Sequence, residues 1–207
     1  MDTEFEAKFY PVNKEEYRKK LQEIGAELVV PERKMRRVIF NHRVNSQIKC
    51  HYLRVRDEGN VIRLSAKTHA EERGQLSDQK EIDIEVSDFD KAVDLLKLAN
   101  LTVSGYQESL RETWKFDGVE IVIDTWPCLD PYTEIEAESE EKVREVAEML
   151  GFKWEEKIIT ASPEIMEKVY GISIEEILKM VTHLTFENNP FNGLTRKAWK
   201  DIIRENK

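Results

Sequence analysis

Residues 3–10 read Thr-Glu-Phe-Glu-Ala-Lys-Phe-Tyr, and this short stretch decides how the rest of the chain is interpreted. Its charged residues, Glu4, Glu6 and Lys8, are separated from one another by single apolar residues. Side chains on a β-strand point alternately to its two faces. The stretch therefore predicts a strand that packs against a core on one side and carries charge on the other.

The same alternation recurs along the first two thirds of the chain. It predicts eight strands, near residues 3–10, 35–41, 50–57, 61–68, 79–86, 108–116, 119–125 and 133–138. The charged face of each strand is largely of one sign: the third strand offers Arg54 and Arg56, and the last offers Glu134 and Glu136. Solvent-exposed faces usually mix the two signs. The segregation of charge therefore needs an explanation.

Two arrangements would explain these charged faces. In the first, a half-buried antiparallel sheet turns them toward bulk solvent. In the second, the strands close into a barrel with helices packed outside, and the charged faces line its interior. A dry interior would not hold so many charges. A hydrated tunnel would, if acidic strands bound divalent cations and basic strands bound the phosphates of a polyanion. The single-sign faces favour the tunnel.

Helix signals lie between the strands and beyond them. Capping residues predict helices that begin at Asn13, Ser87 and Ser139. From about residue 156 the strand pattern stops, and three further helical stretches begin near Pro163, Ser173 and Thr195. We therefore predict an α+β fold, with a strand-rich domain over residues 1–155 and a helical extension over residues 156–207 packed on it.

Composition excludes several classes of protein. The chain has 207 residues and a formal net charge of −9, whereas a general nucleic-acid coat would be basic. No apolar run approaches the roughly 18 residues that a membrane helix needs. We expect neither nucleic acid nor membrane as a partner. Cys50 and Cys128 match no metal or redox spacing, which fits the reducing cytoplasm, where we expect the protein.

Other motifs are weaker. The chain has no glycine-rich phosphate-binding loop, and its four histidines show no zinc spacing. The basic run Arg33–Arg37 would suit contact with RNA, but the edge of a solvated strand is the favoured interpretation. Of this run, Arg37 is an additional candidate for a cation that points inward.

The whole ordered set of motifs resembles the CYTH superfamily, also called triphosphate tunnel metalloenzymes, over about residues 1–155. The resemblance rests on Glu4-Phe5-Glu6-Ala7-Lys8, Leu53-Arg54-Val55-Arg56, Lys67, Lys80-Glu81, Arg111-Glu112, Asp124-Thr125-Trp126-Pro127 and Tyr132-Thr133-Glu134-Ile135-Glu136. The second strand departs from the family pattern, because it lacks the acidic and tyrosine residues common there. The resemblance implies an eight-stranded antiparallel β-barrel, the triphosphate tunnel, with helices outside.

The resemblance also implies residue roles. The metal ligands would be Glu4, Glu6, Glu134 and Glu136, with Asp124 beside them. The substrate-binding cations would be Lys8, Arg54, Arg56, Lys67 and Arg111. Glu81 resembles a tunnel-facing acidic residue and is the candidate catalytic residue. Because carboxylate oxygens suit hard cations, the expected cofactor is Mg²⁺ or Mn²⁺.

The family includes triphosphatases and class IV adenylyl cyclases, so the expected partner is tripolyphosphate, ATP or thiamine triphosphate. We favour a metal-dependent triphosphatase, because hydrolysis needs only the tunnel and water. The alternatives are a class IV adenylyl cyclase, which makes cyclic AMP and pyrophosphate from ATP, and a non-catalytic module that binds polyphosphate or nucleotide. The helical extension could close a tunnel mouth, cover an apolar surface or pair two copies in a homodimer.

Overall fold

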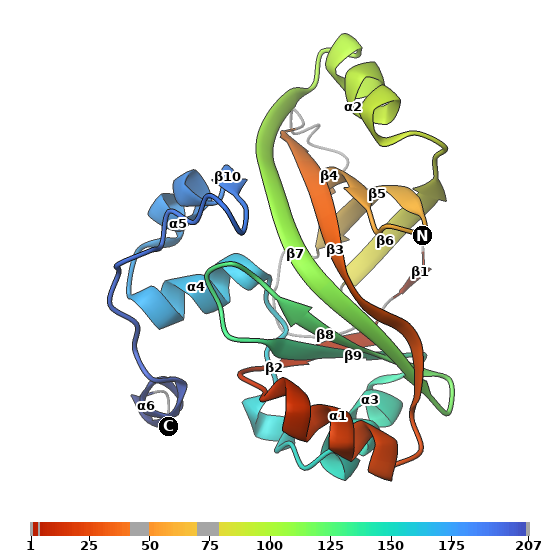
Figure 1. Cartoon of the computed structure of the whole chain (residues 1–207), viewed down its shortest axis with the longest axis vertical. Helices are drawn as coiled ribbons and strands as arrows, with labels where there is room; N and C mark the ends of the chain where they lie inside the picture. Colours follow the sequence, from red (N-terminus) through yellow and green to blue (C-terminus); the bar gives the residue numbers. More distant parts are fainter. Residues whose placement is uncertain (1, 4, 42–49, 70–78, 206–207) are drawn as a thin grey trace.

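The computed structural model describes residues 2–3, 5–41, 50–69 and 79–205. Its centre is one large, strongly curled sheet (Figure 1). The strands are β1 (Asp2–Thr3), β2 (Phe5–Phe9), β3 (Glu27–Asn41), β4 (Cys50–Asp57), β5 (Ile62–His69), β6 (Gln79–Glu85), β7 (Thr102–Phe116), β8 (Val119–Thr125), β9 (Tyr132–Ala137) and β10 (His183–Leu184). The predicted antiparallel sheet with helices outside it is confirmed.

The strand order explains the curl. Neighbouring strands follow the order β1-β6-β5-β4-β3-β7-β8-β9-β2, and every pair on this path is antiparallel. The first and last strands of this order are successive pieces of the N-terminal segment. Asp2 and Thr3 pair with β6, whereas Phe5–Phe9 pair with β9. The N-terminal segment therefore joins the two edges of the sheet, as the prediction of a barrel requires.

Two strands are longer than the alternation predicts. β3 and β7 each have 15 residues and pair along almost their whole length, so they cross the molecule as one twisted ribbon (Figure 1). The register of β3 shifts between Val30 and Arg33, around Pro31. Proline lacks the backbone N–H that a ladder needs, and in sheets it is found at edges and irregularities. This irregularity hid the first half of β3 from the sequence pattern.

The helices lie outside the sheet. They are α1 (Lys14–Glu23), α2 (Phe89–Leu98), α3 (Glu140–Met149), α4 (Ser162–Tyr170), α5 (Ile174–Met180) and α6 (Trp199–Glu205), with a short 3₁₀ turn η2 at Trp154–Glu156. Asn13 and Ser139 cap α1 and α3 through their side chains as predicted, whereas the cap of α2 is Asp88 rather than Ser87. None of the helices in the described ranges is long and apolar enough to cross a membrane.

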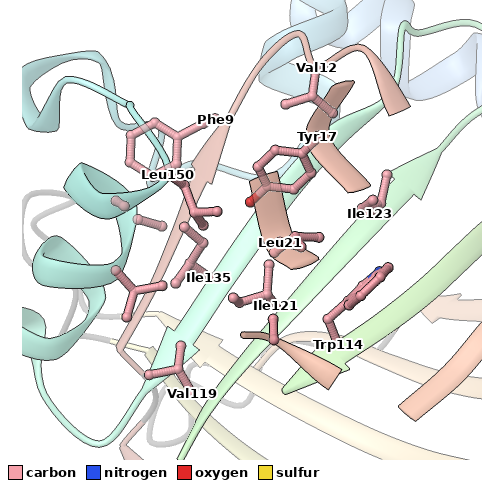
Figure 2. Packing of buried hydrophobic residues seen from close by; sticks show 14 of the residues in the cluster. Phe9, Val12, Tyr17, Leu21, Trp114, Val119, Ile121, Ile123, Ile135 and Leu150 are labelled. Carbon is pink, nitrogen blue, oxygen red and sulfur yellow. The ribbon is translucent and has the colours of Figure 1, made fainter. Parts of the chain in front are cut away.

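The main core lies between α1, α3 and the outer face of β2, β8 and β9 (Figure 2). Ile121, Ile135 and Leu150 are almost completely buried there, and Tyr17 of α1 reaches Thr133 with its hydroxyl, 3.0 Å away. Burial of such side chains stabilises the fold by about 1.5–3 kcal/mol each. This layer holds three strands firmly, so that their opposite, charged faces point into the curl.

The segment after residue 156 contains α4, α5 and α6 and also adds β10 to the sheet. β10 pairs in parallel with β7, with His183 opposite Tyr106 and Leu184 opposite Gln107. A second apolar cluster joins this segment to the sheet through residues such as Trp126, Met166 and Ile177. The extension is therefore attached through both core packing and backbone hydrogen bonds. The division of the chain at residue 155 stays a prediction.

Candidate active site

The curled sheet encloses a cavity of about 1180 Å³. Nine of the residues with predicted roles line it, namely Glu6, Lys8, Arg54, Arg56, Glu81, Arg111, Asp124, Glu134 and Glu136. Glu4 lies outside the described residues. The backbone of Lys67 lies in β5 opposite Glu81, but its side chain is not among those described. The charged strand faces therefore point inward and not toward bulk solvent.

One side of the cavity is basic. We call the inward faces of β3, β4 and β5 the basic wall; its arginines are Arg33, Arg37, Arg54, Arg56 and Arg63. Register places Arg37 opposite Arg56, and Arg56 opposite Arg63. Like charges directly opposite one another destabilise a sheet. The wall therefore needs anions, and Glu81 and Glu58 are two that the described residues supply.

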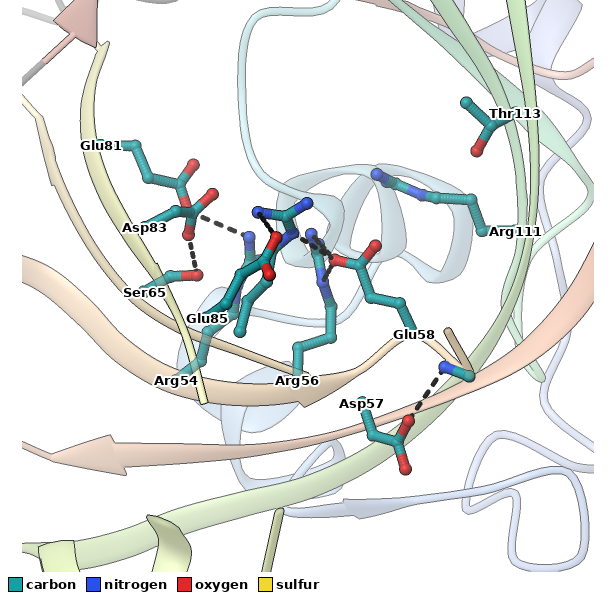
Figure 3. A network of polar contacts seen from close by, with 12 residues as sticks. Arg54, Arg56, Asp57, Glu58, Ser65, Glu81, Asp83, Glu85, Arg111 and Thr113 are labelled. Carbon is teal, nitrogen blue, oxygen red and sulfur yellow. Dashed lines mark hydrogen bonds and ion pairs between the residues drawn. The ribbon is translucent and has the colours of Figure 1, made fainter. Parts of the chain in front are cut away.

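Glu81 and Glu58 are these internal anions (Figure 3). Nη2 of Arg54 donates to Oε1 of Glu81 at 3.0 Å. Nε and Nη2 of Arg56 lie 2.7 and 2.5 Å from Oε1 of Glu58. Burial alone would raise the pKa of Glu58, but the positive charges of Arg56, Arg111 and Arg63 outweigh it, so this pKa is lowered. Glu58 thus remains ionised inside the cavity.

The other side is acidic. We call the inward faces of β2, β8 and β9 the acidic wall; its carboxylates in the cavity include Glu6, Asp124, Glu134 and Glu136. Register places Glu136 opposite Glu6 on one side and Glu120 on the other. These like-charged pairs, which repel one another, are not what a wall serving only for stability would contain.

Two cations lie among these carboxylates. Lys8 contacts Glu6 and lies 3.6 Å from Glu134. Arg111, from β7, donates to both oxygens of Asp124 at 2.7 and 2.5 Å and to Glu134 at 2.7 Å. Burial alone would lower the pKa of Arg111, but Asp124 and Glu134 raise it well above its ordinary value. The guanidinium is therefore permanently charged.

Glu134 lies at the centre of the acidic wall. Its pKa is raised, first by burial and then by the negative charges of Glu6 and Asp124, although Lys8 and Arg111 act in the opposite direction. The raised pKa means that burial and the neighbouring carboxylates disfavour the ionised form of Glu134 more than Lys8 and Arg111 favour it. A bound cation would favour this ionised form.

The donor chemistry of the acidic wall fits a hard divalent cation. All its candidate ligands are carboxylate oxygens, which Mg²⁺ and Mn²⁺ prefer. In the described part of the chain, no three acidic, histidine or cysteine side chains are grouped closely enough to hold one ion. Lys8 and Arg111 take up the carboxylate oxygens instead. The ligands are thus chemically suitable but are paired internally.

The cavity also contains residues that the sequence pattern missed. Arg33 is one of them, whereas Arg37 also lines the cavity but does so as the sequence predicted for an inward-pointing cation. The interpretation of the Arg33–Arg37 run as a solvated edge is therefore wrong for these two residues. It holds for the intervening Lys34, whose side chain is 60% exposed. Glu58 follows the last residue of β4, where the alternation ends, and no sequence signal points to it. Arg63 lies on the charged face of the predicted strand 61–68, but it belongs to none of the motifs and was assigned no role.

The segment after residue 156 forms part of the cavity lining, through Ser162, Lys179 and Thr182 among others. The guanidinium of Arg37 lies 4.1 Å from the centre of the Trp126 ring, and its Nε donates to Oε1 of Gln107 at 3.0 Å. Nε2 of Gln107 in turn donates to the carbonyl of Val181 at 2.9 Å. The extension thus holds an arginine of the basic wall in place through one glutamine.

A family model, the CYTH domain, matches residues 2–170, which is most of the chain and ends with α4. The chain belongs to the CYTH family. Members of this superfamily are metal-dependent triphosphatases or adenylyl cyclases. No curated protein matches the chain.

Solved CYTH-like structures resemble the chain over most of its length. A conserved hypothetical protein from Pyrococcus furiosus is 25% identical, with a TM-score of 0.65 over 77% of this chain and 98% of its own. A candidate adenylate cyclase from Vibrio parahaemolyticus is 13% identical, with a TM-score of 0.67 over 80% and 98%. HpAC1 from Hippeastrum, a candidate adenylyl cyclase with a dominant triphosphatase activity, is 14% identical, with a TM-score of 0.52 over 81% and 94%. At such identities the last two support the fold alone.

Proposed function

We propose that this CYTH protein is a triphosphatase that depends on Mg²⁺ or Mn²⁺ and hydrolyses inorganic or organic triphosphates. The observation that supports the proposal is the meeting of a basic and an acidic wall across one cavity. A triphosphate and divalent cations carry opposite charges and form complexes in solution. A cavity with one wall for each suits that pair, whereas a binding site for a simple anion would need only the basic wall.

The proposed substrate contacts are those of the basic wall and the two cations of the acidic wall. Arginine presents planar pairs of donors that match phosphate oxygens, and lysine adds a compact charge. In this scheme Arg54, Arg56 and Arg111, with Lys8 and Lys67, hold the phosphate chain. Phosphoryl transfer requires mainly positioning and charge stabilisation from the protein, which these side chains provide.

The proposed metal ligands are Glu6, Asp124, Glu134 and Glu136, together with Glu4. A divalent cation held there would neutralise phosphate charge and lower the pKa of a bound water. Substrate arrival would give Lys8 and Arg111 new anionic partners and so release carboxylate oxygens for this purpose. Glu81 is the proposed catalytic residue. Its contact with Arg54 also gives it a positioning role, because it holds that guanidinium in the cavity.

A class IV adenylyl cyclase would use the same contacts with the ribose 3′-hydroxyl in place of water. The cavity volume does not oppose it, because about 1180 Å³ is ample for a nucleotide. A non-catalytic module would bind the same ligands without product. The hydrolase and the cyclase therefore differ in the nucleophile, and we propose that it is water.

One assay separates the three functions. The pure protein is incubated with tripolyphosphate, ATP or thiamine triphosphate, with Mg²⁺, with Mn²⁺, or with a chelator. Phosphate released only with metal supports the triphosphatase. Formation of cyclic AMP together with pyrophosphate would show that the protein is an adenylyl cyclase instead. Binding of the triphosphate without any product would show that it is a non-catalytic module.

A further inference from the structure

Three arginines of the basic wall approach the carboxylate of Glu58 together. Oε1 lies 2.5 Å from Nη2 of Arg56 and 3.5 Å from Nε of Arg63, and Oε2 lies 3.6 Å from Nη2 of Arg33. These arginines come from three neighbouring strands, β4, β5 and β3. The Glu58 side chain is only 10% exposed, although it belongs to the turn between β4 and β5. A turn residue has thus folded back into the cavity.

The charges of this group do not balance. The carboxylate of Glu58 offers a single negative charge and two oxygens, whereas three guanidinium groups offer three positive charges and many donors. Glu85, 3.8 Å from Arg63, adds one further negative charge, but its side chain is largely exposed to solvent. A phosphoryl group carries up to two charges and three terminal oxygens. Arg33, Arg56 and Arg63 are therefore better matched to a phosphoryl group than to the carboxylate that they now hold.

The attachment of Glu58 allows its side chain to leave. Its backbone N–H donates to the carbonyl of Val61 at 2.9 Å, and its own carbonyl accepts from Nε of Arg33 at 2.7 Å. The following residues, Gly59 and Asn60, are exposed. With the backbone fixed on both sides, rotation about side-chain bonds is enough to withdraw the carboxylate, and no strand has to move.

We propose that Arg33, Arg56 and Arg63 form a phosphoryl subsite that Glu58 occupies as an internal competitor until a triphosphate displaces it. The inference rests on the proposed function, because it assumes a triphosphate in the cavity. Displacing Glu58 costs the same for every ligand that enters the subsite, and only a group with more charge than a carboxylate recovers that cost. Glu58 thus selects for phosphoryl groups over carboxylates and other single anions.

The test measures binding by calorimetry, with imidotriphosphate as the probe and Mg²⁺ present. Its bridging nitrogen atoms resist hydrolysis, so binding is observed without turnover. Glu58→Gln removes the competitor and is expected to tighten binding about tenfold. Glu58→Asp keeps the charge but shortens the reach to the arginines, and a smaller gain of about threefold is expected. A general electrostatic effect would leave this second variant unchanged.

Glu85→Gln is the matched control. Glu85 lies 3.8 Å from Arg63, but its side chain is 68% exposed and it does not line the cavity. Removing its charge should change the dissociation constant less than twofold. Thermal unfolding followed by circular dichroism checks that each variant is folded.

The outcomes separate the two proposals. If Glu58→Gln binds the probe as weakly as the unmodified protein, or more weakly, Glu58 is a structural clamp and the inference is overturned. An equal gain in Glu85→Gln would also overturn it. If the unmodified protein shows triphosphatase activity in either case, the proposed function stands. If neither the unmodified protein nor Glu58→Gln binds the probe, the proposed function itself fails.

Discussion

The two walls of the cavity have different foundations. Behind the acidic wall, Ala7, Ile121 and Ile135 are completely buried against α1 and α3. Behind the basic wall lies a smaller cluster under α2, and on the adjoining strand β6 Ile82 and Ile84 are 47% and 52% exposed. The wall with the proposed metal ligands is thus built on the main core, and the wall with the proposed phosphate contacts is not. Metal coordination demands more precise geometry than phosphate binding. The basic wall, which has the smaller apolar cluster behind it, can therefore adjust to a phosphate.

The walls are alike in how they handle charge. Each wall has internal counter-ions beside it: Lys8 and Arg111 contact carboxylates of the acidic wall, and Glu58 and Glu81 contact arginines of the basic wall. Without these counter-ions, the buried like charges of each wall would be costly. The comparison teaches that the charges of each wall are partly neutralised by ion pairs within the protein itself. The following predictions, in order of expected size, test this contrast.

The largest effect is expected from Glu136→Gln in the acidic wall. The substitution keeps the shape of the side chain but replaces an anionic oxygen ligand by an amide NH₂ group, which cannot bind a metal ion. A metal ion contributes several kcal/mol to stabilising the transition state. We expect metal-dependent turnover to fall by about 100-fold or more, measured as phosphate release from tripolyphosphate across a Mg²⁺ titration. An unchanged melting temperature is the control. Near-normal turnover would remove Glu136 from the proposed ligand set.

The different foundations predict a difference in stability. Ile135 lies between Glu134 and Glu136, and Val55 lies between Arg54 and Arg56; both are completely buried. Ile135→Ala should cost about 3–4 kcal/mol and Val55→Ala about 1–2 kcal/mol, because the main core closes less easily around a gap and Ile loses one more carbon. Urea unfolding measures both. A cost at Val55 equal to that at Ile135 would contradict the contrast between the walls.

The sequence predicts the direction of a side chain where local alternation along a strand determines it. It does not predict that direction where tertiary packing determines it. Side chains two apart on one strand share a face, so the alternation alone assigns Arg54 with Arg56, and Glu134 with Glu136, to the interior. Glu58 follows the end of its strand, where alternation has no meaning, and only tertiary packing decides that it turns inward. Pro31 interrupts β3, so the inward direction of Arg33 was hidden. β10 has two residues, too few for any periodicity.

A smaller effect is expected from Arg54→Ala in the basic wall. A charge-assisted hydrogen bond contributes about 1.5–3 kcal/mol, so binding of tripolyphosphate should weaken by about 10- to 100-fold. Binding of monophosphate should weaken much less, because a single phosphate can use other cations of the cavity. Calorimetry on both ligands gives the ratio. Equal losses for the two ligands would show that Arg54 supports the fold rather than a particular phosphate.

The smallest expected effect concerns the pH dependence of stability, and it returns to Glu58. Arg56, Arg111 and Arg63 keep the pKa of Glu58 below its ordinary value. Stability from such a lowered pKa is fully present above the ordinary pKa of glutamate and is lost as the pH falls through the lowered one. The unmodified protein should therefore exceed Glu58→Gln in melting temperature by about 2–4 °C at neutral pH, which corresponds to about 1 kcal/mol.

Below the lowered pKa this difference should disappear, as melting curves that extend from pH 7 into the acid range would reveal. A constant gap at every pH would mean that the charge of Glu58 contributes nothing to stability. If the gap closes while the same variant binds the triphosphate probe more tightly, stability and affinity change in opposite directions. If Glu58 served only the fold, its replacement would lower both the melting temperature and the affinity for the probe. The pair of measurements therefore identifies Glu58 as an anion that stabilises the basic wall until the substrate replaces it.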